Sequence, residues 1–350
     1  MATQSPTAPQ NGAAHGNGQT RPPLPKIGSA REFKGQDLLT LSNLTPGAVL
    51  GLFEAARRLK ADLAAHRATL DNKAVALLFE KPSLRTKMSF EVGIAKLGGH
   101  PIFMDHGAQR LGARESVRDY AKNLERWVEC IVARVYSQAV LEEMAEAARC
   151  PVVNALSDRF HPCQALADLF TLYERAGHDH GRLRGMKLLY VGDGNNVCHS
   201  LIHCSTLLGV DTTVVTPKGF GPAEDVAAEC AAFAREAGSG FAVAHTLGAA
   251  EGHDAVYTDV WVSMGQAGGV DEVTKRRKIF SKFQVNAELM ELAGRGRPSP
   301  AVFMHCLPAQ RGLEVTDEVI DSAHSVVYDQ AENRMHAQNA LLHFMIGKGD

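Results

Sequence analysis

Short apolar runs alternate along this chain with longer stretches in which apolar residues recur every three or four positions. The runs are typical of buried strands, and the recurring pattern is typical of helices that bury one face. Strands are predicted at 74–79, 101–104, 129–135, 151–156, 186–193, 212–217, 255–260 and 301–306. Helices are predicted at 46–66, 86–98, 116–128, 138–148, 165–177, 222–237 and 331–346, and another from about residue 197.

Strands that alternate with helices form parallel sheets. The elements fall into two sets that meet near the helix at 165–177. The pattern therefore predicts an α/β fold with two domains, each a parallel sheet flanked by helices, and an active site in the cleft between them. The last helix, at 331–346, is expected to pack back onto the first domain.

Composition narrows the class of protein. The chain has 350 residues, of which 45% are hydrophobic and 22% charged, with a formal net charge of −2. This near-neutral balance argues against a general nucleic-acid surface, and the one basic cluster, KRRK at 275–278, is interpreted as a solvated loop or helix face. Seven scattered cysteines without a CxxC motif fit a reducing compartment. No apolar run approaches a membrane span, so a cytoplasmic protein without nucleic-acid or membrane partners is expected.

The first residues differ from the rest of the chain. They are rich in Gly, Pro, Ala, Asn, Gln and Thr and have no apolar periodicity. They lack the apolar core of a signal peptide and contain a single Arg before residue 31, which is unlike an organelle presequence. Residues 1–32 are therefore predicted to be a disordered extension.

The first cluster of candidate chemistry lies between the strand at 74–79 and the helix that follows. Two hydroxyl and two cationic side chains stand there: Ser83, Arg85, Thr86 and Lys87. A helix start already carries partial positive charge, and exposed cations at it cost roughly 0.3–1 kcal/mol each. Either Ser83 caps the helix and the cations are solvated, or a doubly negative ligand binds and offsets the repulsion.

Other candidates follow the ends of predicted strands, where open α/β sheets place their ligands. They are Arg134, His161, Gln164, Asn196, Asp259, Ser263, Met264, Cys306 and Leu307. A buried Arg134 would need an anion. His161 and Gln164 either cap a helix or donate hydrogen bonds to a carbonyl oxygen. Asp259 either caps a turn or binds an ammonium group. By itself, Cys306 is most simply a small buried hydrophobe.

Two motifs suggest other functions only weakly. VGDGNN after a strand is similar to a dinucleotide fingerprint, but Val197 stands at the third glycine position and Thr216 where an acidic residue would bind the ribose. His199 and His203 have the spacing of metal ligands on a helix, but no third ligand accompanies them, which favours structural histidines. Anion-binding residue types thus gather in the first half and amine-binding types in the second. This division indicates a phosphate-bearing donor and an amine-bearing acceptor.

Together these motifs resemble those of the ornithine carbamoyltransferases, in the aspartate/ornithine carbamoyltransferase family. The resemblance runs from about residue 35 to the end of the chain. It rests on SLRTK at 83–87, LGARES at 111–116, Arg134, HPCQ, DGNN, DVWVSMG, HCLPA and ENRMH. It departs from the family pattern at Lys87, where the motif usually has Arg, and at Arg110, where many relatives have Gln or His. Gln109 is the neighbour of Arg110.

The resemblance implies transfer of the carbamoyl group from carbamoyl phosphate to the δ-amine of L-ornithine, giving L-citrulline and phosphate without a metal or other cofactor. It implies a carbamoyl phosphate-binding domain at 33–165, an ornithine-binding domain at 166–322, and a C-terminal helix at 323–350 on the first domain. It also implies a homotrimer or a multiple of trimers. Carbamoyltransferases for putrescine or N-acetylornithine are the alternatives within the class. A nicotinamide-dependent oxidoreductase is a less favoured alternative, and the anabolic or catabolic direction stays open.

The resemblance also assigns roles to residues. It assigns carbamoyl phosphate binding to Ser83, Leu84, Arg85, Thr86, Arg110, Arg134, His161, Gln164, Cys306, Leu307 and Arg334. It assigns ornithine binding to Asn196, Asp259, Ser263 and Met264. It assigns catalytic roles to Arg85, His161, Asp259 and Cys306. Arg334, which would otherwise pass for a surface cation, steadies the carbamoyl end of the substrate in this assignment.

Overall fold

The computed structural model describes residues 21–28, 32–262 and 270–348. The first domain contains a four-stranded parallel sheet in the order β2-β1-β3-β4. Its strands are β1 (Ala74–Phe79), β2 (His100–Asp105), β3 (Cys130–Arg134) and β4 (Val152–Leu156). Its helices are α1 (Pro46–Ala61), α2 (Leu84–Lys96), α3 (Val117–Leu124) and α4 (Gln138–Ala147). The central strands β1 and β3 are apolar over nearly their whole length because helices cover both faces of a parallel sheet.

The second domain contains a five-stranded parallel sheet in the order β7-β6-β5-β8-β9. Its strands are β5 (Lys187–Val191), β6 (Asp211–Val215), β7 (Phe241–Ala244), β8 (Ala255–Thr258) and β9 (Val302–His305). Its helices are α6 (His180–Arg184), α7 (Asn196–Leu207), α8 (Glu224–Ala237), α9 (Val270–Phe280), α10 (Ala287–Gly294) and α11 (Asp317–Ile320). The prediction of a two-domain α/β fold with parallel sheets is confirmed.

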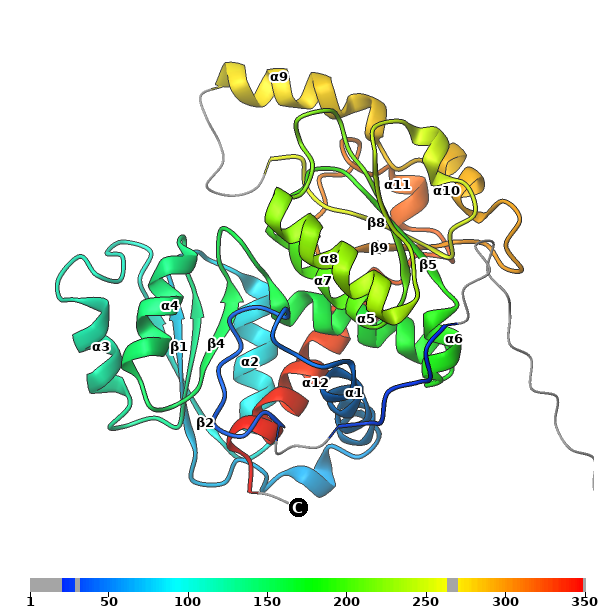
Figure 1. Ribbon diagram of the computed structural model, residues 1–350. Coiled ribbons are helices and arrows are strands. Elements are labelled where there is room, and N and C mark those ends of the chain that lie inside the picture. The colour runs from blue at the N-terminus through cyan, green and yellow to red at the C-terminus, as the bar shows by residue number, and fades with distance from the viewer. Residues whose placement is uncertain (1–20, 29–31, 263–269, 349–350) are drawn as a thin grey trace, which may run out of the picture.

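Two long helices lie where the domains meet. The helix α5 (Pro162–Arg175) joins the domains, and nearly all of its side chains are buried. The C-terminal helix α12 (Val327–Ile346) packs against α5 and also against α1 and α2. Figure 1 shows it, in red, running from the second domain down beside α1 and α2 of the first. Side chains of α12 can therefore reach both domains.

Strand register brings the carboxyl ends of the strands together at one edge of each sheet. In the first sheet, Phe79 pairs with Asp105 on one side and with Arg134 on the other. In the second sheet, Thr258 pairs with His305. The residues that follow these strands therefore lie at the same edge of each sheet, and the candidate site lies at this edge.

Several elements differ from the prediction. The first helix ends at Ala61 rather than at residue 66, and the turn that follows is a 3-10 helix at Ala64–His66. The helix predicted to begin at 331 begins at Val327, and the helix predicted from 165 begins at Pro162. The elements α6, β7, α9, α10 and α11 were not predicted. Most of these are short, and β7 is an edge strand whose residues are not buried, so its apolar signal is weak.

Residues 21–28 of the predicted N-terminal extension make contacts with both domains. The Arg21 guanidinium forms an ion pair with Asp211 (3.1 Å), and Arg184 Nη1 donates to the Pro22 carbonyl oxygen (2.9 Å). At the other end of the segment, the Gly28 N–H donates to the Gly47 carbonyl on α1 (2.7 Å). A β-carbon at Gly47 would come within 2.4 Å of a backbone oxygen of this segment, so the close approach requires glycine there.

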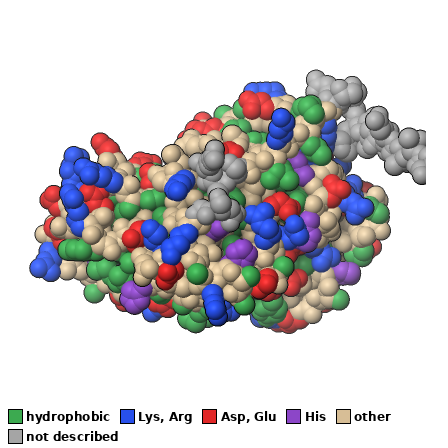
Figure 2. All heavy atoms as spheres, turned by 90° about the horizontal axis from the view of Figure 1, so that it is seen from below, with side chains coloured by type: hydrophobic (Ala, Val, Ile, Leu, Met, Phe, Trp, Pro, Cys, Tyr) green, Lys and Arg blue, Asp and Glu red, His purple; other side chains and the backbone are tan. Residues whose placement is uncertain are grey.

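The surface carries charges of both signs. Figure 2, which views the molecule from below, shows Lys and Arg side chains intermixed with Asp and Glu side chains over this face. This mixture agrees with the formal net charge of −2. Among the described helices, none combines the length and the apolar character that crossing a bilayer requires.

Candidate active site

A cavity of about 380 Å³ lies at the carboxyl ends of the strands, between the two domains. Twelve of the fifteen residues assigned to the site from the sequence line it: Ser83, Leu84, Arg85, Thr86, Arg134, His161, Gln164, Asn196, Asp259, Cys306, Leu307 and Arg334. Of the other three, Ser263 and Met264 lie outside the described residues. The third, Arg110, packs with its guanidinium over the Tyr136 ring, 4.0 Å from the ring centroid, and is not among the described residues that line the cavity.

The first helix turn of α2 forms one wall of the cavity. Ser83 is the N-cap of α2, and its hydroxyl oxygen accepts a hydrogen bond from the Thr86 backbone N–H (3.3 Å). The cap follows from the sequence, because a serine in extended conformation before a helical run satisfies one of the free N–H groups. Capping and site formation are thus compatible roles for this residue. The next cation, Lys87, points elsewhere: its ammonium group lies 3.7 Å from the Phe103 ring centroid and 3.9 Å from Glu91 Oε1.

The same end of the cavity concentrates positive charge. Arg134 and Arg334 are 7% and 2% exposed, and Arg85 is partly buried. Burial, followed by the charges of Arg334 and Arg85, lowers the pKa of Arg134 to about 10. Its Nε is buried without a hydrogen-bond partner among the described residues. Buried cations with unused donors create a place for an anion, since an anion would supply both the charge and the acceptors.

Neutral hydrogen-bond donors stand beside these cations. His161 is the N-cap residue of α5 and is 4% exposed. Burial, followed by the charges of Arg334 and Arg134, holds the pKa of His161 well below its ordinary value, so the imidazole is neutral. Its Nδ1 has no hydrogen-bond partner among the described groups. Arg334 donates to Gln164 Oε1 (2.5 Å) and to Thr86 Oγ1 (3.2 Å), which fixes both of these side chains at the cavity wall.

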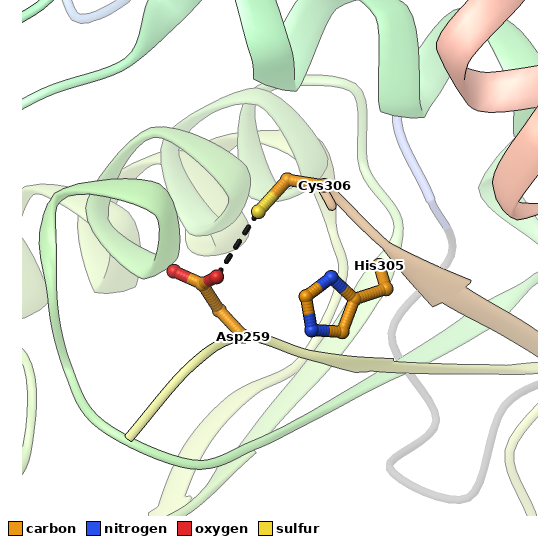
Figure 3. A group of neighbouring side chains, drawn as sticks. All are labelled: Asp259, His305 and Cys306. Carbon is orange, nitrogen blue, oxygen red and sulfur yellow. Dashed lines mark hydrogen bonds between the residues drawn. The ribbon is translucent and has the colours of Figure 1, made fainter. Parts of the chain in front are cut away.

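The second domain contributes a carboxylate to the cavity. Asp259 follows β8, is 5% exposed, and accepts hydrogen bonds from the Cys306 thiol (3.0 Å) and from Asn195 Nδ2 (2.7 Å). Figure 3 shows the Asp259 carboxylate and the Cys306 thiol turned toward each other, with the His305 ring nearby. Burial raises the pKa of Cys306 well above its ordinary value, and the Asp259 charge raises it further. Cys306 is therefore a neutral thiol and a donor to Asp259, not a thiolate nucleophile.

Asn196 and Leu307 complete this end of the cavity. Asn196 donates from Nδ2 to the Ser157 carbonyl oxygen (2.6 Å), so its side chain is held between the two domains. The Leu307–Pro308 peptide is cis, and Leu307 has a φ of +55°. The Leu307 N–H donates to His305 Nδ1 (2.8 Å), which holds this turn at the end of β9.

Two groups of side chains contain residue types that can bind a metal ion. Asp259, His305 and Cys306 have donor atoms within 4.8 Å of one another, but His305 Nδ1 already accepts the Leu307 N–H. Among the helix histidines, His199 uses both ring nitrogens: Nδ1 lies 2.9 Å from the Arg159 carbonyl oxygen, and Nε2 accepts the Ala223 N–H. These contacts favour structural roles for the imidazoles.

The glycine-rich GDG segment also has a packing role. A β-carbon at Gly194 would lie 2.2 Å from the Gly221 and Pro222 backbone. The glycine thus accommodates another part of the same chain, whereas a dinucleotide fingerprint uses glycine to admit a pyrophosphate. This contact weakens the nicotinamide alternative.

The interpretation of KRRK as a solvated face is wrong for one of its four residues. Arg276 forms an ion pair with Asp193, donates to the Trp261 carbonyl, and lies 4.9 Å from the centroid of the Phe220 ring. Burial raises the Asp193 pKa to about 6 even though the Arg276 charge lowers it. The other three cations of the cluster are exposed, as expected. Periodicity alone could not identify the buried cation, because its partner is 83 positions away in the sequence.

Sequence reasoning missed four polar residues in and behind the site: Lys81, Gln310, Asp168 and Gln330. Lys81 lines the cavity, and its ammonium group lies 4.3 Å from the centroid of the Tyr136 ring. Burial, followed by the Arg134 charge, lowers its pKa. Asp168 and Gln330 are fully buried behind the cavity wall. The only available signal for Asp168 was a lone carboxylate within the apolar stretch of α5.

The comparisons agree with this geometry. Residues 36–174 match the aspartate/ornithine carbamoyltransferase, carbamoyl-P binding domain, and residues 184–345 match the Asp/Orn binding domain of the same group. A relative from Shewanella oneidensis named ornithine carbamoyltransferase is 48% identical over 304 residues, which cover 87% of this chain and 97% of that protein. A relative from Pyrococcus furiosus named ornithine carbamoyltransferase, anabolic, is 46% identical over 316 residues, covering 89% of this chain and 97% of its own.

The structures agree as well. The solved structure of the Pyrococcus furiosus ornithine carbamoyltransferase superimposes with a TM-score of 0.83 at 45% identity, covering 90% of this chain and 98% of that one. An N-acetyl-L-ornithine transcarbamylase structure superimposes with a TM-score of 0.79 at 28% identity, covering 89% and 100% of the two chains.

Proposed function

This chain belongs to the aspartate/ornithine carbamoyltransferase family, and on that premise we propose how its cavity carries out the reaction. The protein is a carbamoyltransferase that uses ornithine: it transfers the carbamoyl group of carbamoyl phosphate to the δ-amine of L-ornithine, giving L-citrulline and phosphate. One observation supports the assignment of cavity residues to the two substrates. The first domain contributes the buried Arg134 to the cavity and the second domain contributes the buried Asp259 carboxylate, as a dianionic donor and an amine acceptor require.

The phosphate group of carbamoyl phosphate binds at the arginine end. Arg85 and Arg134 supply charge-assisted hydrogen bonds, and the backbone N–H groups of Leu84 and Arg85, at the start of α2, supply the remainder. The unused Nε of Arg134 supports this role. A bound phosphate also explains why the chain keeps an arginine at a helix start, because the phosphate neutralises a charge that would otherwise be unfavourable.

The carbonyl oxygen of the substrate lies beside the neutral donors. His161, Gln164 and Thr86 polarise it, and Arg334 steadies the carbamoyl end. Because negative charge grows on this oxygen as the amine adds, donors fixed in advance stabilise the transition state more than the ground state. The low pKa of His161 keeps its imidazole neutral, so it serves as a hydrogen-bond donor and not as a cation.

Ornithine binds at the other end. Its α-amino group binds Asp259 and its α-carboxylate binds Asn196, while Ser263 and Met264 are proposed to close the pocket. The δ-amine must be uncharged to attack the carbonyl carbon. The new C–N bond gives a tetrahedral intermediate, whose C–O bond to phosphate then breaks, and the departing phosphate takes up one amine proton. Cys306 and the Leu307 carbonyl lie beside the attacking amine, and every step uses protein groups alone.

Assembly and location are part of the proposal. We infer a homotrimer from the family resemblance. Apolar side chains exposed at the edge of the first sheet and the start of α2 support an interface there: Leu84, Met88 and Ile102 are 72%, 48% and 37% exposed. Exposed apolar groups on a sheet edge suit a protein interface. All seven cysteines are free, which supports a reducing, cytoplasmic location.

The test is an assay of product formed from carbamoyl phosphate with ornithine, putrescine or N-acetylornithine. Ornithine should give product at the highest kcat/KM, because putrescine has no α-groups for Asp259 and Asn196 to hold. N-acetylornithine lacks the α-ammonium charge that pairs with Asp259. A higher kcat/KM with either competitor would overturn the substrate assignment and leave the reaction class in place.

A further inference from the structure

Behind the cavity wall lies a carboxylate that touches neither end of the cavity directly. Asp168 is on α5, one turn after Gln164, and its side chain is 0% exposed. One of its oxygens, Oδ1, accepts two hydrogen bonds, from Gln164 Nε2 (2.7 Å) and from Gln330 Nε2 (2.8 Å). Burying a carboxylate is costly, so its presence beside two amides, with the Tyr257 hydroxyl and the Arg334 charge nearby, calls for a reason.

The hydrogen bonds of Asp168 form a network with two arms. The first arm, from Asp168 to Gln164, holds the Gln164 amide in one orientation. An amide side chain can present either its oxygen or its nitrogen to a substrate, and the two are similar in shape. Here Gln164 Oε1 accepts from Arg334 Nη1 (2.5 Å), and one N–H is held by Asp168. The amide therefore cannot turn over without losing two hydrogen bonds. Its second N–H is left for the cavity that Gln164 lines.

The second arm of the network, from Asp168 to Gln330, leads to the part of the cavity that is assigned to the amine. Gln330 on α12 is 0% exposed and accepts the His305 backbone N–H at its Oε1 (3.0 Å). His305 is the last residue of β9 and immediately precedes Cys306. One carboxylate oxygen is thus linked, through two glutamines, to the wall that faces the carbonyl group and to the strand that carries the thiol.

We propose that Asp168 is a positioning residue that fixes the Gln164 amide for the carbamoyl group and, through Gln330, aligns the end of β9 with it. This role rests on the proposed function. An acceptor-only group is suited to it, because a carboxylate can accept from both amides and never competes with them as a donor. The raised pKa of Asp168, about 6, still leaves the group ionised at neutral pH.

The test is a double-mutant cycle on turnover at saturating substrates. Gln164→Ala and Asp168→Ala should each lower kcat by about 10- to 100-fold, the usual effect of losing a hydrogen bond made in the transition state or its orienting partner. In the Gln164→Ala background, Asp168→Ala should cost less than about threefold more, because it acts through the missing amide. Effects that multiply fully would overturn the proposal.

Two controls separate positioning from a general loss of structure. Inhibition by inorganic phosphate should change less than about twofold in Asp168→Ala, because the phosphate contacts are made by Arg85 and Arg134 and not through Asp168. Asp168→Asn, which keeps an oxygen acceptor, should retain kcat within about fivefold of wild type. Weakened phosphate inhibition in parallel with kcat would show a merely structural role.

If Asp168→Ala does not fold, Gln330→Met tests the second arm without removing the carboxylate. It should raise the KM for ornithine several-fold and leave phosphate inhibition unchanged, since only the β9 end loses its hydrogen bond. An unchanged ornithine KM would remove the link between the two ends. Citrulline formation by the wild-type protein is measured first, so that failure of the proposed function is seen there and is distinct from failure of the positioning role.

Discussion

Arg85 combines three properties that decide how the anion end of the cavity works. It lies in the first turn of a helix, it is partly buried, and burial lowers its pKa. A cation in that position is stabilised by a bound dianion and destabilised without one. The residue is therefore expected to contribute far more to binding of the substrate than to folding.

Replacing Arg85 by Met keeps most of the volume and removes the charge. Losing one partner of a desolvated charge-assisted pair costs roughly 2–5 kcal/mol, which corresponds to a loss of about 30- to 4,000-fold in kcat/KM for carbamoyl phosphate. Lys87→Met is the matched control, because that cation lies over Phe103 and does not line the cavity. Steady-state kinetics with varied carbamoyl phosphate measures both. A loss below fivefold in Arg85→Met, or an equal loss in the control, would contradict the anion site.

The charge state of the nucleophile predicts a pH dependence. A free alkyl amine has a pKa of about 10.4, so the neutral fraction of ornithine grows about tenfold per pH unit below that value. The pKa of His161 is held well below its ordinary value by burial, so His161 stays neutral across the range. Activity at subsaturating ornithine should therefore rise steeply from pH 6 to pH 8. A flat profile would mean that amine attack does not control the rate.

The buried carboxyl group predicts a dependence of stability on pH. In the folded protein burial raises the pKa of Asp168 to about 6, whereas the unfolded chain has a value of about 3.9. The folded state thus holds this proton more tightly. Wild-type stability accordingly falls by up to about 1.4 kcal/mol per unit as the pH rises between the two values. The Asp168→Asn variant has no carboxyl proton to release, so its stability does not fall in this way. Its Tm relative to that of the wild type should therefore increase as the pH rises from about 4 to about 6.

Other groups near Asp168 are the same in the wild-type protein and in the Asp168→Asn variant. The Arg334 charge and the Tyr257 hydroxyl lower the carboxyl pKa, while the thiols of Cys204 and Cys306 face it and remain neutral. Thermal unfolding of the two proteins from about pH 4 to about pH 7 measures the difference in Tm. A difference that does not vary with pH would mean that the carboxyl group does not titrate with this raised pKa.

At the scale of elements, the strands of both sheets were predictable except β7, which lies at an edge of the second sheet. The segment AVALLF forms β1 and is buried at every position after Ala74, so burial has left a continuous apolar run in the sequence. The edge strand β7, only four residues long, has no buried residue, and the helix α9 buries only Phe280. Elements that bury little leave little pattern in the sequence, since burial is what selects apolar residues.

Some residues of the candidate site could likewise be predicted from the sequence and others could not. Residues at strand ends, such as Arg134 and Asp259, could be predicted because parallel sheets place ligands there. Asp168 and Gln330 lie inside helices and are 162 positions apart, so only the packing of α12 on α5 brings them together. Local patterns contain no information on such a pairing.

The N-terminal segment at 21–28 gives an element-scale prediction. Arg21 pairs with Asp211 and also donates to the Arg184 and Gly209 carbonyl oxygens, which ties the segment to the second domain. Arg21→Ala should lower stability by about 1–2 kcal/mol and the Tm by roughly 2–4 °C. The kcat should stay unchanged, because every described residue that lines the cavity lies at position 81 or beyond.

Lys26→Ala is the matched control for this change. Lys26 is in the same segment, carries the same charge, and is exposed without an ion pair among the described residues. Thermal unfolding of the two variants should show a lower Tm for Arg21→Ala alone. An equal effect of Lys26→Ala would show that net charge, and not the contacts of Arg21, stabilises the protein.

At the scale of the whole molecule, the segment at 105–116 suggests that the site is completed by a second copy. It follows β2, the edge strand of the first sheet, and most of its side chains are exposed. Within one chain the Arg110 guanidinium stacks over Tyr136 and does not line the cavity among the described residues. In the proposed trimer, this loop reaches the phosphate site of the neighbouring subunit, in a head-to-tail contact that closes into a ring.

Mixing two inactive variants tests this assembly. Arg85→Met removes the cation from the site's own chain, and Arg110→Ala removes the one that a neighbour would supply. After dissociation, equal mixing and reassembly, a working site needs an intact Arg85 from its own chain and an intact Arg110 from the next. Random mixing gives each a probability of about one half, so about one quarter of the sites should recover in a closed ring. Full activity of Arg110→Ala alone would exclude the loop from the site. A mixture that stays inactive after exchange of subunits has been verified would place both residues in a site formed by a single chain.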